Sequence, residues 1–149
     1  MTLKETIYHY YQQQVQDKMD AFRDMISALT EDSKNDAKGS AGDKHETALS
    51  MMHLEQEKLN YKLAEILDQK AVLDKIDPEA ASEIIVLGTL VQANGLLLFI
   101  STALPKITIE GKAVFAVSPK SPLASQMIGK AVGFAFAVNG TNYTIENVW

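Results

Sequence analysis

This chain of 149 residues contains no cysteine, one tryptophan and no long hydrophobic run. Without cysteine there is neither a disulfide framework nor thiolate chemistry, a composition that fits a reducing compartment. The longest apolar stretch, Gly95 to Ile100, is far too short to span a bilayer. The N-terminus also lacks a basic region followed by an apolar core, the pattern of a secretory signal. We therefore expect a cytoplasmic protein without a membrane partner.

An excess of basic residues is also missing. The net charge is −5, which argues against phosphate-driven or sequence-specific DNA binding. No HExxH motif, no cysteine nucleophile and no recognisable Ser-His-Asp context occurs, so we do not expect an autonomous enzyme. We expect no stably bound cofactor and a monomer.

Charge and hydrophobicity divide the chain into two parts. Residues 1–76 hold 10 Lys/Arg and 14 Asp/Glu, a balance of −4, whereas residues 77–149 hold 4 and 5, a balance of −1. The first part is charged and helix-patterned, and the second is apolar and strand-patterned. Asp77-Pro78 fits a helix end followed by proline in a new first turn. The sequence predicts domains at 1–76 and 77–149.

Apolar residues in the first part recur at three- and four-residue steps, which predicts two long helices. The first runs from about Leu3 to Leu29, roughly 40 Å, and the second from Asp43 or Lys44 to about Ile76, roughly 48 Å. The stretch Thr30 to Gly42 has no large apolar residue and predicts a mobile connection. The pair should form an antiparallel hairpin with a coiled-coil-like seam.

The second part predicts a small, mostly antiparallel sheet with one helix packed on it. Ser121 is the expected N-cap of that helix, Pro122 its first residue and Gly129 its stop. The Asn139-Gly140 pair predicts a hairpin turn. The helix should turn Leu123, Met127 and Ile128 toward the sheet. The expected strands are Ile84–Leu87, Leu96–Ile100, Ile107–Ile109, Ala113–Val117, Phe134–Val138 and Tyr143–Ile145. The predicted fold class is α+β.

Two carboxylates, Asp43 and Glu46, lie at the tip of the predicted hairpin. Their spacing has a purely structural interpretation, since an N-cap followed three residues later by Glu is a capping box. A functional interpretation is that the tip carries carboxylates into another molecule as charge or as metal ligands. Both interpretations can hold for the same residues. His45, between them, is interpreted as a solvated surface residue.

Two motifs resemble the Gre family of bacterial transcription elongation factors. The run Ser118 to Gly133 contains Ser-Pro, a small residue, an apolar pair, Gly-Lys and then Gly, as in the family's C-terminal domain. The tip, Gly42 to Ala48, has the family pattern Gly-Asp-x-x-Glu-x-Ala. Gly88 to Val91 looks like the first strand of that domain. The resemblance covers nearly the whole chain in the family's order, hairpin first and sheet domain second.

The resemblance implies a mechanism. The hairpin would enter the secondary channel of RNA polymerase, and Asp43 and Glu46 would help to hold a Mg²⁺ ion shared with the polymerase. The polymerase would then hydrolyse the 3′ end of a backtracked nascent RNA, which the factor touches only indirectly. The C-terminal domain, similar in fold to FK506-binding proteins, would dock at the channel entrance. We take Ser121, Pro122, Gly129 and Lys130 as its candidate partner contacts.

Two alternatives stay open. One keeps the fold but makes the chain a channel-binding regulator or inhibitor without cleavage activity, as some Gre-like proteins are. The other is a coiled-coil interaction protein unrelated to polymerase, whose sheet domain binds a different partner. The tip carboxylates separate the first two functions, and polymerase binding separates both from the third.

Overall fold

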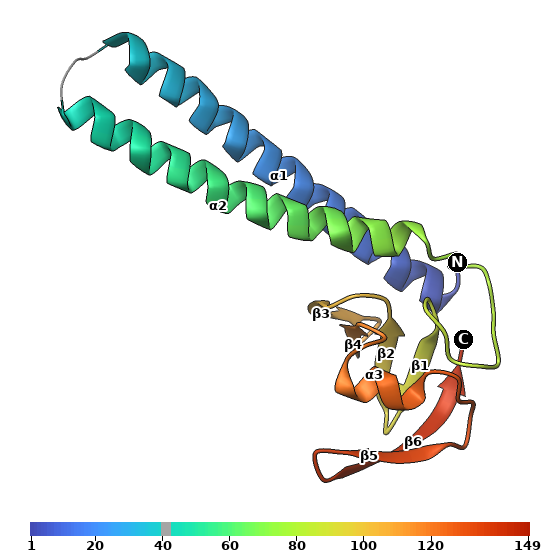
Figure 1. Ribbon diagram of the computed structural model, residues 1–149. Helices are drawn as coiled ribbons and strands as arrows, with labels where there is room; N and C mark the ends of the chain where they lie inside the picture. Colours follow the sequence, from blue (N-terminus) through green and yellow to red (C-terminus); the bar gives the residue numbers. More distant parts are fainter. Residues whose placement is uncertain (40–42) are drawn as a thin grey trace. The chain divides into compact units, whose positions relative to one another are not determined.

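A computed structural model describes residues 1–39 and 43–149, and their side chains at 1–32 and 46–149. The α+β class is confirmed, with a helical hairpin followed by a six-stranded sheet and a short helix (Figure 1). The chain forms two compact units, one of residues 13–70 and one of residues 1–12 with 71–149. The elements are α1 Leu3–Gly39, α2 Asp43–Asp74, β1 Leu90–Ala93, β2 Leu96–Ile100, β3 Leu104–Ile109, β4 Lys112–Val117, α3 Pro122–Met127, β5 Ala135–Val138 and β6 Thr141–Val148.

In the unit of residues 13–70, α1 and α2 run side by side in opposite directions (Figure 1). The predicted hairpin is therefore confirmed. Its seam follows a repeat of three- and four-residue steps on both helices, which keeps one narrow stripe facing the partner. The buried or half-buried members are Val15, Met19, Phe22, Ile26 and Leu29 on α1, and Leu49, Met52, Gln56, Leu59, Leu63 and Ile66 on α2.

Among the described side chains, a hydrogen bond and a cation–π contact cross this seam. The Nε2 amide of Gln56 donates to Oγ1 of Thr30 at 3.0 Å, while that hydroxyl donates to the carbonyl of Ile26 at 2.9 Å. The ammonium of Lys62 lies 6.0 Å from the centre of the Phe22 ring. Because Gln56 occupies a seam position, its amide needs a partner on α1. The bond to Thr30 therefore favours one register of the two helices.

The predicted connection at Thr30–Gly42 is wrong over most of its length, because α1 continues to Gly39. The stretch lacks large apolar residues, but it also lacks proline, and glycine appears only at its end. Ala, Glu and Lys within it are good helix formers. A polar composition alone does not end a helix when the residues before it are already helical and packed in the seam. The predicted range of α2 is confirmed, with the helix ending two residues before Ile76.

The sheet has the order β3-β4-β2-β1-β6-β5. All neighbouring strands are antiparallel except β2 and β4, which pair in parallel from Leu97 opposite Val114 to Ile100 opposite Val117. The Asn139-Gly140 turn is confirmed, with φ of 51° and 79° at its two residues. Positive φ at both positions is the type I′ geometry whose twist suits a two-residue hairpin.

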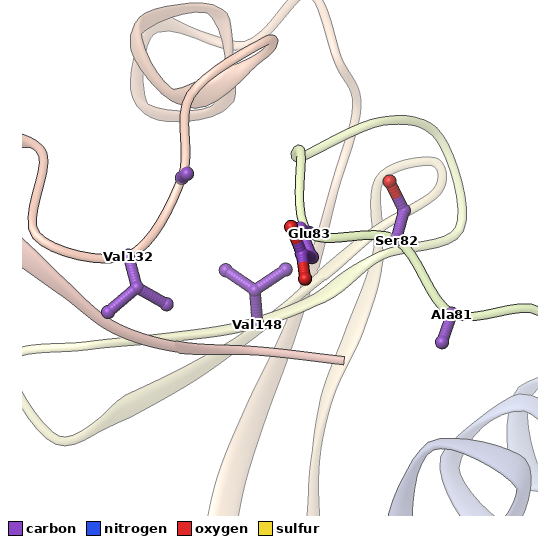
Figure 2. Close-up of a pocket in the computed structure, with 6 residues that line it drawn as sticks. Ala81, Ser82, Glu83, Val132 and Val148 are labelled. Atoms are coloured by element: carbon purple, nitrogen blue, oxygen red, sulfur yellow. The ribbon is translucent and has the colours of Figure 1, made fainter.

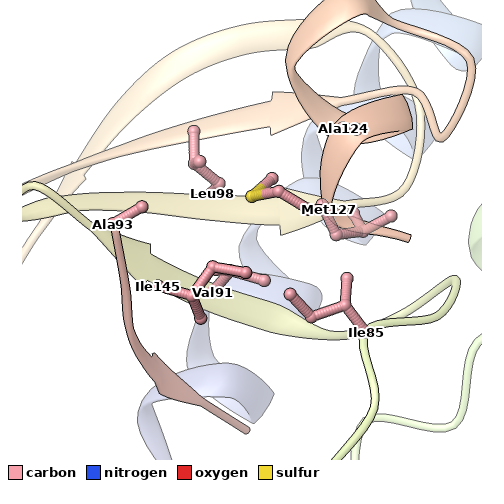
Figure 3. Packing of buried hydrophobic residues seen from close by; sticks show 8 residues of the cluster. Ile85, Val91, Ala93, Leu98, Ala124, Met127 and Ile145 are labelled. Atoms are coloured by element: carbon pink, nitrogen blue, oxygen red, sulfur yellow. The ribbon is translucent and has the colours of Figure 1, made fainter. Parts of the chain in front are cut away.

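The hydrophobic core of the unit of residues 1–12 and 71–149 lies between the sheet and α3. Figure 3 shows Met127 of α3 reaching toward Leu98 and Ile145 of the sheet, with Ile85 closing the far side. Met127 and Ala124 are both fully buried. The Oγ of Ser121 accepts the N–H of Ala124, so the predicted cap is confirmed. The expectation that Ile128 faces the sheet is wrong, because the helix ends at Met127 and Ala124 occupies the inward position instead.

The predicted strand at Ile84–Leu87 is also wrong. This segment is irregular, and only Ile85 in it is fully buried. The N–H of Ile85 donates to the carbonyl of Lys130, and the N–H of Gly129 donates to the carbonyl of Ile85. The segment thus pairs only through Ile85 with the loop after α3. Ile85 is also its one fully buried residue, so the apolar run is not a strand. The first strand of the sheet starts later, at Leu90.

The first turns of α1 pack within the same compact unit as the sheet. Tyr11 is fully buried, and its hydroxyl donates to the carbonyl of Pro105 at 2.8 Å. The hydroxyl of Tyr8 donates to the carbonyl of Leu73 at 2.9 Å. Burying an aromatic ring contributes a large hydrophobic gain, and each hydroxyl needs a partner once water is excluded. These contacts join residues 1–12 to residues 71–149.

Candidate functional site

The hairpin tip is the first candidate site. Helix α2 begins at Asp43, and Glu46 lies in its first turn with an exposed side chain. The side chains of Asp43 and His45 lie outside the described residues, so the predicted capping box and the separation of the two carboxylates stay predictions. What is described is a carboxylate at position 46 that faces solvent, near the positive end of a long helix.

The residues after Glu46 show which side of α2 turns inward. Ala48 and Leu49 are half-buried and begin the seam, whereas Ser50 is exposed like Glu46. Because residues four apart lie on the same helix face, Glu46 and Ser50 share a surface outside the seam. The Glu46 carboxylate is therefore available to another molecule without disturbing hairpin packing.

Among the described side chains, no three of His, Cys, Asp and Glu come close enough together to hold a metal ion. A carboxylate oxygen such as that of Glu46 suits a hard cation like Mg²⁺, but a single one is a poor site. A magnesium ion bound through Glu46 would need further oxygen ligands, from Asp43 and from another molecule. No helix in the described part of the chain has the length and hydrophobicity to cross a membrane.

The predicted partner contacts gather around α3. Ser121 and Pro122 lie at its beginning, and Gly129 and Lys130 follow its end. Each also has a local structural role: Ser121 caps the helix, and Gly129 has a φ of 79° where the helix stops. Pro122, Gly129 and Lys130 are exposed. The ammonium of Lys130 lies 4.8 Å from the centre of the Phe134 ring.

An open pocket of about 620 Å³ lies beside this loop (Figure 2). Val132 and Val148 line it on one side, and the backbone segment with Ser82 and Glu83 lines it on the other. Val132 is 58% exposed. The lining combines two valines with a single carboxylate and holds no acid–base pair. The chemistry of this pocket suits a binding surface and offers no catalytic set.

A buried lysine was not predicted from the sequence. Lys4 is only 7% exposed, and its Nζ donates to the carbonyl of Ala80 at 2.6 Å and to the backbone oxygen of Trp149 at 3.2 Å. Burial lowers the pKa of Lys4, while the nearby Asp77 carboxylate raises it by a smaller amount. In the sequence, Lys4 resembles any polar residue of an amphipathic helix, so no local signal identifies it.

Comparison with known proteins finds likenesses among solved structures alone. No protein-family model matches the chain, and no curated protein matches it. Three chains of solved structures match, among them the transcription factor Gfh1, with 14% sequence identity, coverage of 92% of each chain and a TM-score of 0.36. At this identity and TM-score the comparison does not establish a family for this chain.

Proposed function

We propose that this protein is a Gre-like factor that binds RNA polymerase and inserts its helical hairpin into the secondary channel. Its Asp43 and Glu46 carboxylates then act at the polymerase active centre to stimulate cleavage of backtracked transcripts. The observation that carries the proposal is an exposed Glu46 in the first turn of α2, within the Gly-Asp-x-x-Glu-x-Ala pattern.

The dimensions of the hairpin support this function. Helix α1 has 37 residues and α2 has 32, which at 1.5 Å per residue gives lengths of about 55 Å and 48 Å. The seam residues hold the two antiparallel helices side by side, and the charged side chains of residues 17–32 and 46–68 are exposed. A paired rod of this kind suits entry into a water-filled channel better than burial in a protein core.

The chemistry requires only carboxylate oxygens from this chain. A Mg²⁺ ion held jointly with the polymerase would polarise the scissile phosphate and activate water. Glu46 and Asp43 would supply hard oxygen ligands to this ion, and the helical hairpin would hold these carboxylates at its tip. We therefore propose that the chain completes a site in the polymerase and is not an enzyme by itself.

The test is RNA cleavage in stalled, backtracked elongation complexes of a bacterial polymerase at fixed Mg²⁺ concentration. Wild-type protein should stimulate cleavage, and Glu46→Ala and Asp43→Ala should each lower the rate, on the order of a hundredfold. Glu31→Ala is the matched control, because Glu31 is an exposed carboxylate of α1 outside the motif. It should leave the cleavage rate unchanged.

Two other outcomes would replace the proposal. If the wild type does not stimulate cleavage but displaces a known cleavage factor from the polymerase, the chain is a regulator that occupies the channel. If it neither stimulates nor displaces, the polymerase function is wrong. An interaction protein with a different partner is then the remaining hypothesis.

A further inference from the structure

The two edges of the sheet differ in how they are protected. The β3 edge carries Pro105, which has no N–H, and Lys106, whose ammonium lies 5.3 Å from the Phe115 ring. The pairing of β3 with β4 is irregular between Leu104 and Ile107. The Tyr11 hydroxyl donates a hydrogen bond to the carbonyl of Pro105, which is then no longer free for another strand. Proline, lysine and bulges are the features by which proteins keep an edge from pairing with another chain.

Within Ala135–Val138, strand β5 has none of these features. The run from Ala131 to Val138 contains neither charge nor proline, and β5 ends the order of strands. Phe136 and Val138 are half-buried, whereas Ala135 and Ala137 are exposed. An uncharged edge strand with small exposed side chains is a template for an additional strand.

The free hydrogen-bonding groups of β5 can be identified. In the β5–β6 hairpin, Ala135 lies opposite Thr144 and Ala137 opposite Asn142. The N–H of Thr144 donates to Oδ1 of Asn94, and the carbonyl of Asn142 accepts from Nδ2 of Asn94. Both residues of β6 thus direct these groups away from β5. In an antiparallel pair, opposite residues alternate between bonded and non-bonded. Ala135 and Ala137 therefore direct their N–H and C=O groups to the free edge.

Side chains beside this edge indicate what an added strand would carry. The rings of Phe134 and Phe136 are stacked 5.9 Å apart, and those of Phe136 and Tyr143 are stacked 5.3 Å apart. This aromatic row is half-buried and packs against the core. An added strand would place every second side chain next to it. Apolar side chains at those positions would extend the row.

Charge selects between possible occupants. Between Gly129 and Val138 the one charged residue is Lys130. Lys130 lies against the Phe134 ring, at the beginning of the aromatic row. The next acidic residue, Glu146, accepts the N–H of Gly95. An acidic side chain at this end of an added strand would find a complementary charge in the Lys130 ammonium.

We propose that the free edge of β5 binds an extended, acidic segment of a partner protein by strand addition. The backbone groups of Ala135 and Ala137 make the hydrogen bonds, alternate apolar side chains contact Phe136, and an acidic residue lies near Lys130. This site is separate from the hairpin tip and does not depend on cleavage activity.

The test uses the fluorescein-labelled peptide Glu-Val-Thr-Val-Thr-Val-Glu and the full chain. Amide hydrogen exchange followed by NMR should show new protection at Ala135 and Ala137 when the peptide is added. Phe136 is the internal control, because it forms a bonded pair with Tyr143 and is protected already. Absence of binding, or protection at other strands only, would overturn the proposal.

Two variants separate backbone pairing from side-chain effects. Ala137→Pro removes the outward N–H without removing a bond to β6, and should weaken peptide affinity about fivefold or more. Ala137→Ser retains the N–H at the same exposed position and should bind like the wild type. Equal affinity of the proline variant would contradict strand addition.

Two further controls test the occupant. A peptide with Lys in place of both Glu residues should bind more weakly, and equal affinity would show that the acidic preference is wrong. Sedimentation of the wild type without peptide should show no self-association. A dimer that Ala137→Pro abolishes would show that a second copy occupies the edge, which overturns the proposed partner.

Discussion

The ring of Tyr11 lies parallel to the ring of Phe99, with centroids 6.3 Å apart and an angle of 6° between the planes. Both side chains are fully buried. Because the Tyr11 hydroxyl also bonds to Pro105, one residue of α1 contacts both β2 and β3. This contact fixes the first turns of α1 on the sheet.

Tyr11→Phe should lower the free energy of unfolding by about 1 kcal/mol. The ring and its stacking remain, but the hydrogen bond from the hydroxyl to the carbonyl of Pro105 is lost. Urea unfolding followed by the fluorescence of Trp149, the single tryptophan, measures the change. Tyr10→Phe is the control, since Tyr10 is 47% exposed and should change stability little. Equal effects of the two variants would contradict the role of the Pro105 bond.

Stability should fall between pH 10 and 12 because of the same residue. Burial, and to a smaller extent the neighbouring Tyr10, raises the pKa of Tyr11 to about 12 from 10.0. In this window the unfolded chain releases the Tyr11 proton while the folded chain retains it, so rising pH favours unfolding. The contribution is complete below pH 10. Tyr11→Phe should unfold with a shallower pH dependence over this range, and an unchanged slope would contradict the shift.

Gly88→Ala should destabilise the protein more than Gly140→Ala. Both glycines have positive φ, 92° and 79°, so alanine at either position is strained by about 1–2 kcal/mol. At Gly88 a Cβ would also lie 3.0 Å from Cγ2 of Ile76, whereas at Gly140 it meets no atom within 4 Å. Thermal unfolding of the two variants measures the difference. Equal losses would mean that Ile76 moves aside without cost.

The Ser121 side chain should contribute stability through its cap. Ser121→Ala removes the oxygen that accepts the Ala124 N–H at 3.2 Å and should cost about 1 kcal/mol. Ser121→Asn should restore most of it, because asparagine caps helices equally well. Ser125→Ala, in the same short helix, is the control for loss of a hydroxyl. If Ser121→Asn is stable yet binds polymerase poorly, the hydroxyl also contacts the partner.

Gln56 and Thr30 should be coupled across the seam. A double-mutant cycle with Gln56→Leu and Thr30→Val should give a coupling energy of about 0.5–1 kcal/mol from their 3.0 Å bond. Amide hydrogen exchange in α1 and α2 reports the local stability of the hairpin unit. Additive effects would show that the bond does not help to set the register.

Much of the fold could be predicted from local patterns. The helical hairpin, the cap at Ser121 and the turn at Asn139-Gly140 each depend on neighbours in sequence, and the structure confirms them. Ile84–Leu87 could not be predicted correctly, because a run of apolar residues does not reveal that Ile85 alone is buried against Lys130. The continuation of α1 past Leu29 was not predicted, because residues 30–39 contain no large apolar residue and so show no apolar periodicity.

The candidate site was predictable only in part. Glu46 is exposed and the side chain of Asp43 lies outside the described residues, so the roles of both carboxylates stay predictions. Lys4 and the free edge of β5 were not found from the sequence. Their importance comes from residues far away in the chain: Ala80 and Trp149 for Lys4, and Asn94 for the orientation of the edge.

The membership of residues 1–12 in the same compact unit as the sheet has a consequence for synthesis on the ribosome. Lys4 bonds to the backbone of Trp149, 145 residues later, and β1 obtains its neighbour β6 only after residues 141–148 have been translated. Residues 13–70 form their contacts locally and can fold early, whereas contacts of high sequence separation form slowly. Tyr11 must therefore remain uncovered until at least Phe99 and Pro105 have emerged, and Lys4 must wait longer, until Trp149 has emerged.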